Sequence, residues 1–249
     1  MLSEERQSRI VSVVNEQKSV TIQELMEILN ASESTIRRDL AELGERGLLE
    51  RVYGGAIAKN VVFTRRDESF NARQELNREA KLRIACYAAS LIENEDFVYL
   101  DAGTTTELMI PFIKANAVFV TNGFSHARRL SEAGFLTYIL GGEVKFPTEA
   151  VVGEEAILTL SKYHFTKGFW GTNGISITNG FSTPDIKEAL VKQTSLNRTR
   201  TRYIVSDSSK FSQISCITFA DFTDATIITA DLDEKHASYR KYTTVKEVN

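Results

Sequence analysis

The chain has 249 residues, of which 42% are hydrophobic and 25% charged, and its formal net charge is -3 at pH 7. This composition is that of a globular protein, and the length allows a small domain beside a larger one. The longest apolar stretches, such as FVYL and YIV, are much shorter than the roughly 20 residues of a membrane-spanning helix, and no signal-peptide pattern follows Met1. These features argue against a membrane protein and predict a cytoplasmic one.

Disulfides and metal sites are not expected. Cys86 and Cys216 are far apart in sequence and lie in apolar contexts, so we predict buried thiols and no disulfide. The three histidines, His126, His164 and His236, are scattered rather than spaced as zinc ligands. We predict neither a metal nor a cofactor.

Two amphipathic helical patterns open the chain. In the first, Ile10, Val13 and Val14 form one apolar face. The second follows Thr21, which stands three residues before Glu24 at the spacing of a capping box. The residues that mark this second helix are the staple pair Val20 and Leu25 and the apolar face of Ile22, Leu25, Met26 and Leu29.

A third helix, from about Ser32, turns Ile36, Leu40 and Leu43 inward and leaves a polar face outward. Two short helices separated by a tight break are typical of a helix-turn-helix, whose recognition helix places its N-terminal residues in the major groove of DNA. Guanidinium groups bind guanine or phosphate there with two hydrogen bonds.

After Gly47, the segment LLERVYGGAIA alternates apolar and polar positions around Gly54 and Gly55, which predicts two short strands and a turn. The module is therefore predicted to be a winged helix. The predicted DNA contacts are Ser32, Ser34, Thr35, Arg37, Arg38, Arg51 and Tyr53.

Overall charge does not support DNA binding, because residues 1–60 carry eight Lys and Arg against ten Asp and Glu, a net charge of -2. Binding must then depend on the local placement of the arginines. The alternative is a solvated helical hairpin whose arginines only offset Glu33, Asp39 and Glu42.

The run from TIQELMEIL through STIRRDLAELGERGLLERVYGGA resembles the amino-terminal signature of the DeoR family of bacterial transcriptional regulators. The TIRRDL core, the G-L centre and the terminal GGA are all present. This resemblance implies a winged helix-turn-helix that binds operator DNA and usually represses carbohydrate or nucleoside genes.

Residues 58–77 include the charged run RRDESFNAR and lack clear periodicity, which predicts a linker between domains of residues 1–57 and 78–249. A helix is expected over residues 79–92. From Phe97 onward, apolar β-rich runs alternate with helical patterns: FVYL then 104–114, VFV then 125–133, TYIL then 154–162, followed by GFWG, YIV and TIIT. This alternation predicts an α/β fold with a largely parallel sheet flanked by helices.

In such folds ligands bind beyond the carboxyl ends of the strands. There the sequence places DAGTTT, TN, GGE, GTNG and SDSSK, five polar or glycine-rich loops at one edge. DAGTTT joins a strand to a helix, which suits phosphate, although Thr104 or Thr105 could equally serve only as helix caps.

The other signals are weaker. Paired glycines are often only a turn, asparagine is common in turns, and an isolated lysine is usually solvated. Their shared position at the strand ends strengthens each of them.

The same arrangement resembles the carboxy-terminal sensor domain of the DeoR family, which is similar in fold to ribose-phosphate isomerases and glucosamine-phosphate deaminases. DAGTTT, TN, GGE, GTNGI, STPDIKEALVK and SDSSKF occur in family order, so the resemblance covers nearly the whole chain. It implies contacts with a phosphorylated sugar effector from Asp101, Gly103, Thr104, Thr105, Thr106, Thr121, Asn122, Gly141, Gly142, Asn173, Gly174, Lys192 and Lys210.

Asn173 departs from the family pattern, because many members, and the enzyme relatives, have a carboxylate there, and an amide cannot act as a general base. Asp101 and Glu188 lack neighbours that suggest a tuned acid and base. We therefore expect a ligand-controlled repressor of carbohydrate genes rather than an enzyme, acting as a homodimer or homotetramer on paired half-sites.

Two alternatives remain open. The first is a sugar-phosphate isomerase or deaminase with an accessory DNA-binding module. The second is a nucleotide sensor, which no GxGxxG or Walker A motif supports.

Overall fold

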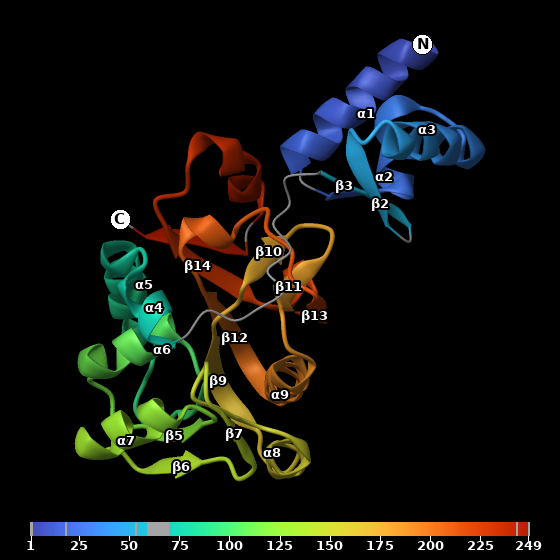
Figure 1. Ribbon diagram of the computed structural model, residues 1–249. Coiled ribbons are helices and arrows are strands. Elements are labelled where there is room, and N and C mark those ends of the chain that lie inside the picture. The colour runs from blue at the N-terminus through green and yellow to red at the C-terminus, as the bar shows by residue number, and fades with distance from the viewer. Residues whose placement is uncertain (1, 18, 53, 59–69, 243, 249) are drawn as a thin grey trace.

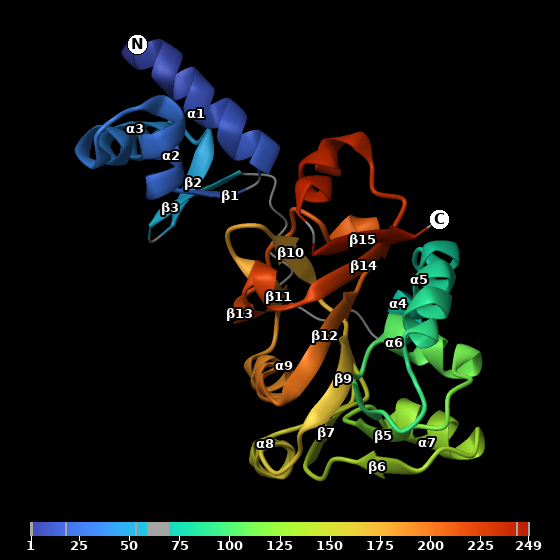
Figure 2. The same cartoon turned by 180° about the vertical axis from the view of Figure 1, so that it is seen from behind.

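The computed structural model describes residues 2–17, 19–52, 54–58, 70–242 and 244–248. An N-terminal winged helix, residues 2–58, is blue in Figure 1, and the larger domain that follows runs from green to red. The winged helix lies beside the end of the larger domain that carries strands β10 (Gly174–Ser176) and β11 (Gly180–Thr183), as both Figure 1 and Figure 2 show.

Three helices form the winged helix: α1 (Ser3–Gln17), α2 (Ile22–Leu29) and α3 (Glu33–Glu45). The apolar faces expected from the sequence meet in one core, which includes Ile10, Val14, Leu25, Ile36, Leu40 and Leu43. The predicted capping box starts α2, because the Glu24 amide donates to Thr21 Oγ1 and the Thr21 amide donates to the Glu24 carboxylate. The three predicted helices are confirmed.

The predicted wing is an antiparallel hairpin of β2 (Leu49–Val52) and β3 (Gly55–Ala58). A strand that the sequence did not predict, β1 (Ser19–Thr21), pairs with β3. The close pairing explains Gly55, since a Cβ there would lie 2.1 Å from the carbonyl oxygen of Val20. Tyr53, a predicted DNA contact at the turn, lies outside the described residues.

Across the described residues of the larger domain, seven strands form one parallel sheet in the order β15-β14-β12-β9-β4-β5-β6. Their carboxyl ends therefore share one edge. The strands are β4 (Phe97–Leu100), β5 (Val118–Thr121), β6 (Thr137–Ile139), β9 (Phe165–Trp170), β12 (Thr199–Val205), β14 (Thr226–Ala230) and β15 (Val245–Val248).

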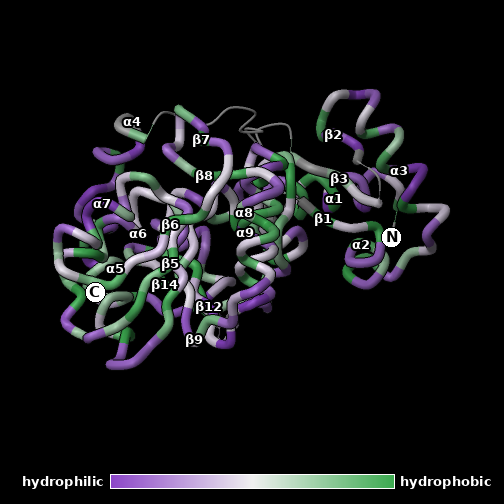
Figure 3. The backbone as a smooth tube through the Cα atoms, turned by 90° about the horizontal axis from the view of Figure 1, so that it is seen from below, coloured by the Kyte–Doolittle hydropathy of each residue, from purple (hydrophilic) through white to green (hydrophobic). Residues whose placement is uncertain are grey.

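Helices cover both faces of this sheet, so the predicted α/β fold is confirmed. One layer comprises α5 (Arg78–Ser90), α6 (Thr104–Met109) and α7 (Phe124–Glu132), which contribute Ile84, Met109 and Leu130 to one core. The other comprises α8 (Glu154–Leu160) and α9 (Ile186–Asn197), which contribute Leu160 and Val191 to a second core. Figure 3 shows hydrophobic, green stretches through the interior and purple ones along the outer turns.

Several short elements were not predicted, because they span too few residues to show a period. Besides β1 and β15 they are α4 (Phe70–Glu75), the hairpin of β7 (Glu143–Lys145) and β8 (Ala150–Val152), the antiparallel sheet β10-β11-β13, with β13 at Ile217–Ala220, and the 3-10 helices η2 (Ser208–Lys210), η3 (Phe222–Asp224) and η4 (Glu234–Lys241). A further 3-10 turn, η1 (Ile110–Phe112), extends α6 within the predicted helix of residues 104–114.

The expectation of buried cysteines is wrong. Cys86 and Cys216 are both exposed, and they form no disulfide. Cys86 lies on the outer face of α5, and Cys216 lies just before β13, so their apolar sequence neighbours turn inward while the thiols do not. No helix among the described residues is long and apolar enough to cross a membrane.

Candidate functional site

The outward face of α3 carries the predicted recognition residues. Ser34, Arg37 and Arg38 are exposed and Thr35 is half-buried, while α3 lies on the side of the winged helix away from the larger domain (Figures 1 and 2). Ser32 stands at the N-cap without capping the backbone, and its hydroxyl lies 2.9 Å from that of Thr35. This face is therefore free to enter a DNA groove.

Three of the four acidic side chains of α3, those of Glu33, Asp39 and Glu42, have partners within the winged helix. Arg37 pairs with Glu33 one turn away at 2.7 Å, and both side chains are more than half exposed, at 56% and 55%. Asp39 is buried and pairs with Arg6 of α1 at 2.5 Å, and Glu42 accepts a hydrogen bond from Gln7.

Arg38 and Arg51 complete the described part of the predicted DNA-binding face. Both are exposed. A Cβ on Gly44 would lie 3.3 Å from the stem of Arg51, so Arg51 crosses the last turns of α3. The exposed Glu33–Arg37 pair is weak in water, so Arg37 can exchange Glu33 for a phosphate or a base at little cost.

A cavity of about 70 Å³ lies at the carboxyl edge of the parallel sheet and is called the strand-end cavity below. Loops after β4, β9 and β12 line it together with α9 and the segment from α4 to α5. The lining residues are Arg73, Leu76, Asn77, Lys81, Ala102, Gly103, Thr104, Thr105, Gly171, Thr172, Asn173, Glu188, Lys192, Val205, Ser206, Asp207, Ser209 and Lys210.

Lys192 of α9 fixes the first of these loops. Its Nζ pairs with Asp101 Oδ2 and donates to the carbonyl oxygen of Gly171 at 3.2 Å, so it links the ends of β4 and β9. Burial raises the pKa of Asp101, and Lys192 acts in the opposite direction. Asp101 Oδ1 is buried and has no hydrogen-bond partner among the described residues.

Arg73 and Lys81 are lining cations that were not predicted from the sequence. Nε and Nη2 of Arg73, on α4, are buried and find no hydrogen-bond partner within the described ranges. Lys81 is also buried, and its Nζ donates to Thr104 Oγ1 at 3.2 Å and to the Arg73 carbonyl oxygen.

A sequence signal existed for Lys81 only. It shares the apolar face of α5 with Ile84 and Ala88 at helical spacing, where a lysine is unexpected. Arg73 lies in a charged run without periodicity, and only the fold of α4 shows its position.

His126 and Asn122 brace the DAGTTT loop from behind. His126 Nε2 lies 3.1 Å from the Gly103 carbonyl oxygen and 3.0 Å from Thr106 Oγ1. The amide of Ala102 donates to Asn122 Oδ1 at 2.8 Å. A Cβ on Gly123 would lie 2.4 Å from the His126 ring, so Gly123 makes room for it. The ring of Phe70, on α4, packs edge-on against the His126 ring at 6.4 Å.

Of the paired glycines Gly141 and Gly142, the second is required by the β7–β8 hairpin. Gly142 has φ +139, and a Cβ there would lie 2.5 Å from the carbonyl oxygen of Val152 in β8. Thr121 is also outside the lining of the strand-end cavity, and its Oγ1 accepts a hydrogen bond from the Gly123 amide.

The structure thus divides the thirteen predicted effector contacts. Six line the strand-end cavity: Gly103, Thr104, Thr105, Asn173, Lys192 and Lys210. Seven lie outside its lining: Asp101, Thr106, Thr121, Asn122, Gly141, Gly142 and Gly174. Direct effector contact by any of them stays a prediction, and the contacts described above give Asp101, Thr106 and Asn122 supporting roles in the same loops.

An exposed recognition helix joined to an α/β domain with a polar strand-end cavity defines a class of two-domain DNA-binding regulators. Two family descriptions match the chain, "DeoR-like helix-turn-helix domain" over residues 6–61 and "DeoR C terminal sensor domain" over residues 76–232. The chain belongs to the DeoR family of transcriptional regulators.

Similar proteins agree with this assignment. The chain is 44% identical to the "Uncharacterized HTH-type transcriptional regulator FruR" of Bacillus subtilis, over 100% of this chain and 99% of that one. It is 33% identical to the "Lactose phosphotransferase system repressor" of Streptococcus mutans, over 98% and 99% of the two chains. These relatives are regulators, so the chain is a transcriptional regulator and not an isomerase or deaminase.

Among solved structures, the ribose 5-phosphate isomerase A of Methanocaldococcus jannaschii aligns with a TM-score of 0.40 and 14% identity over 54% of this chain and 55% of that one. This similarity is too distant to bear on function.

His126 predicts a pH dependence of stability. Burial lowers its pKa to about 3, so the folded chain keeps the ring neutral, whereas the unfolded chain takes up a proton below about pH 6.5. Protonation of the unfolded state alone stabilises that state. The contribution of His126 is therefore fully present above pH 6.5 and is lost as the pH falls towards 3, by up to about 1.4 kcal/mol per unit.

Urea unfolding at pH 7, 6 and 5, followed by the fluorescence of the buried Trp170, measures this dependence. We expect His126→Gln to show a shallower loss of stability on acidification than the wild type. The exposed His164→Gln serves as the control and should follow the wild type. An NMR titration of the folded chain in which the His126 ring protonates near pH 6.5 would contradict the assignment.

Proposed function

We propose that this DeoR-family regulator represses carbohydrate-metabolism genes and that a phosphorylated sugar in the strand-end cavity controls its affinity for operator DNA. Two guanidinium nitrogens of the half-buried Arg73, Nε and Nη2, are buried without a partner among the described residues, and they carry this proposal. The similarity to the lactose phosphotransferase system repressor of Streptococcus mutans supports the link to carbohydrates.

The charges of the lining suit a phosphate. Four cations, Arg73, Lys81, Lys192 and Lys210, are among the lining residues, against two acids, and Lys192 already pairs with Asp101. Both acids are already engaged: the Asp207 carboxylate accepts from Asn77 Nδ2 at 2.9 Å, and the Glu188 carboxylate accepts from Thr148 Oγ1 at 2.6 Å and Lys145 Nζ at 3.0 Å. A buried guanidinium without partners is costly, and an anion that accepts two hydrogen bonds from it offsets that cost.

The volume of the cavity limits what fits without movement. Pockets that enclose small molecules usually measure roughly 300–1,000 Å³, whereas this one measures about 70 Å³. The space takes a group of phosphate size, and the attached sugar requires the lining segments to separate. Ligand binding at this site is therefore expected to change the shape of the domain.

DNA binding is assigned to the outward face of α3 and to the wing. Ser34, Arg37 and Arg38 stand on the first two turns of α3, the part that reaches base edges in helix-turn-helix proteins, and Arg51 follows on β2. Asp39 is buried and paired with Arg6, so its carboxylate does not lie on the exposed face that is proposed to meet DNA.

We also propose a homodimer, because an operator with two half-sites requires two winged helices, one for each half-site. Strand β6 is the last strand of the sheet in the observed order, and several large apolar side chains around it are exposed. They are Phe124, Leu136, Tyr138, Ile139, Val144 and Phe146, the last 90% exposed. A two-fold contact between the β6 edges of two copies would cover them.

We keep residues 1–57, 58–77 and 78–249 as the proposed domain boundaries, and the cytoplasm as the proposed location. The described end of the 58–77 segment contains α4, and its Arg73 lines the strand-end cavity. The linker thus contributes a wall of the proposed effector site.

Replacement of Arg37 by Ala is expected to weaken operator binding by about 1 to 3 kcal/mol, since one guanidinium contact to a base or phosphate is lost. Fluorescence anisotropy with an operator duplex at fixed salt measures this loss. Arg46→Ala is the control, because Arg46 is also exposed but stands at the C-terminal end of α3. Equal affinities of the wild type and Arg37→Ala would remove Arg37 from the interface.

Replacement of Arg73 by Ala is expected to weaken sugar-phosphate binding by about 1.5 to 3 kcal/mol, the usual value of hydrogen bonds to charged groups. A thermal-shift screen of ribose 5-phosphate, fructose 1-phosphate, fructose 6-phosphate and glucose 6-phosphate measures binding, because a ligand of the folded chain raises its melting temperature. Thr105→Glu, which adds a negative charge to the lining, should also abolish the shift.

Arg78→Ala is the matched control for this screen, since Arg78 is exposed at the start of α5 and does not line the cavity. It should respond like the wild type. A full response from Arg73→Ala and Thr105→Glu would move the phosphate site elsewhere, and the absence of any response from the wild type would refute a sugar phosphate of this panel as effector.

The homodimer is tested by sedimentation of Phe146→Ser combined with Tyr138→Lys. We expect this variant to sediment at about half the mass of the wild-type particle, because it places polar groups in the proposed contact. Leu158→Ser, at a half-exposed apolar position on α8, should leave the mass unchanged. An unchanged mass in the double variant would show that this surface is not the interface.

A further inference from the structure

The winged helix contacts the larger domain through Ile214. This residue belongs by sequence to the larger domain, in the loop between η2 and β13, yet it is 9% exposed and packs in the same cluster as Ile10, Val14 and Leu25 of the winged helix. A side chain of one domain thus completes the apolar core of the other.

The same loop begins in the strand-end cavity. Ser206, Asp207, Ser209 and Lys210 all line that cavity, and only three residues separate Lys210 from Ile214. We call residues 206–214 the coupling segment. Its first half faces the proposed effector, and its last residue touches the DNA-binding domain.

The coupling segment is held as a single unit. The amide of Phe211 donates to the Ser208 carbonyl oxygen at 3.2 Å. The amide of Gln213 donates to the Lys210 carbonyl oxygen at 3.3 Å. The Phe211 ring is buried and packs against Tyr239 at 4.9 Å. These contacts hold residues 208–213 together, so a displacement of Lys210 also displaces Ile214.

The loop after β9, which also lines the cavity, contacts the coupling segment. Asn173 lines the cavity, and a Cβ on the next residue, Gly174, would lie 2.5 Å from the Gln213 carbonyl oxygen. The amide of Ser212 donates to the Ile175 carbonyl oxygen at 2.8 Å. The loops after β9 and β12 thus meet immediately before Ile214, and separation of either loop changes the position of that contact.

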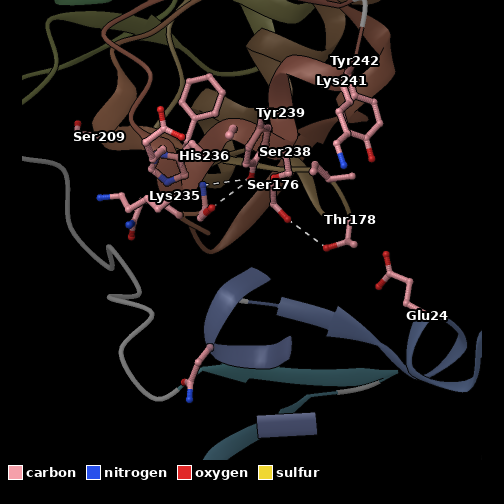
Figure 4. Close-up of a pocket in the computed structure, with 17 residues that line it drawn as sticks. Glu24, Ser176, Thr178, Ser209, Lys235, His236, Ser238, Tyr239, Lys241 and Tyr242 are labelled. Carbon is pink, nitrogen blue, oxygen red and sulfur yellow. Dashed lines mark hydrogen bonds between the residues drawn. The ribbon is translucent and has the colours of Figure 1, made fainter. Parts of the chain in front are cut away.

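An open cleft lies beside the contact between the domains. Its volume is about 940 Å³, with Asn15 and Glu24 of the winged helix on one side and Ser176, Thr178 and Gln213 on the other. Figure 4 shows Glu24 facing Thr178 across this gap. Among the described residues, Ile214 is the member of the larger domain that packs in the buried apolar cluster of the winged helix.

We propose that the coupling segment transmits occupancy of the strand-end cavity to the winged helix through Ile214. This inference rests on the proposed function: a sugar phosphate larger than the cavity separates its loops, displaces the coupling segment and changes how the winged helix docks, and with it the affinity for operator DNA. Coupling of this kind is reciprocal, so operator DNA changes effector affinity by the same factor.

The test compares the full-length wild type, Ile214→Ser and Ile186→Ser, the last an exposed isoleucine on α9 that serves as control. Anisotropy gives the operator Kd with and without the panel sugar phosphate that produces the largest thermal shift, and calorimetry gives the Kd of that sugar phosphate without DNA. The ratio of the two operator Kd values in the wild type is expected to lie between about 5-fold and 150-fold.

For Ile214→Ser we expect this ratio to fall below about twofold, while the sugar-phosphate Kd stays within about threefold of the wild type, because the coupling changes and the binding sites do not. Ile214→Val, which keeps an apolar branched side chain, should retain the wild-type ratio. Hydrogen exchange without any ligand should be faster in α1 and β1 to β3 of Ile214→Ser than in the same elements of Ile186→Ser.

A wild-type ratio in Ile214→Ser, or unchanged exchange in its winged helix, would overturn the inference. The proposed function fails by a different result, namely that no sugar phosphate of the panel binds the wild type or that binding leaves its operator Kd unchanged.

Discussion

The buried ion pair between Lys192 and Asp101 is the interaction on which the site depends. It joins α9 to the end of β4, and through the Gly171 carbonyl oxygen it also holds the end of β9. Removing both charges from water is costly unless the remaining polar atoms are satisfied. Because one Asp101 oxygen lacks a partner among the described residues, the pair is not fully compensated. It fixes the strand ends relative to the helix layer, and the polar loops open around it.

Much of this architecture follows from local sequence patterns. The Thr21–Glu24 spacing located the start of α2, and the alternation of apolar runs with helical patterns predicted the parallel sheet. The rule that ligands bind beyond strand ends selected the loops, and the family resemblance selected residues in and near them. Of these residues Gly103, Thr104, Thr105, Asn173, Lys192 and Lys210 line one cavity. These features depend on residues close in sequence, so a single chain reveals them.

The rest depends on tertiary contacts. The strand-end rule gives the edge but not the direction of each side chain, so Asn122 braces the DAGTTT loop from behind and Gly142 supports the β7–β8 hairpin. Arg73 enters the lining because α4 folds back over the edge, with Phe70 packed on His126. Ile214 is a similar case, because nothing near it in sequence shows that its partner lies two hundred residues earlier in the chain.

The internal pairing of the acids on α3 has a consequence for how DNA binding depends on salt. Glu33, Asp39 and Glu42 each have a partner inside the winged helix, so the module approaches a promoter with few surplus cations. Affinity for a duplex falls with rising salt in proportion to the number of phosphates that the protein neutralises, because that number sets how many counterions are released. A protein of this kind is expected to release few ions, so its affinity for a promoter should vary little with salt concentration.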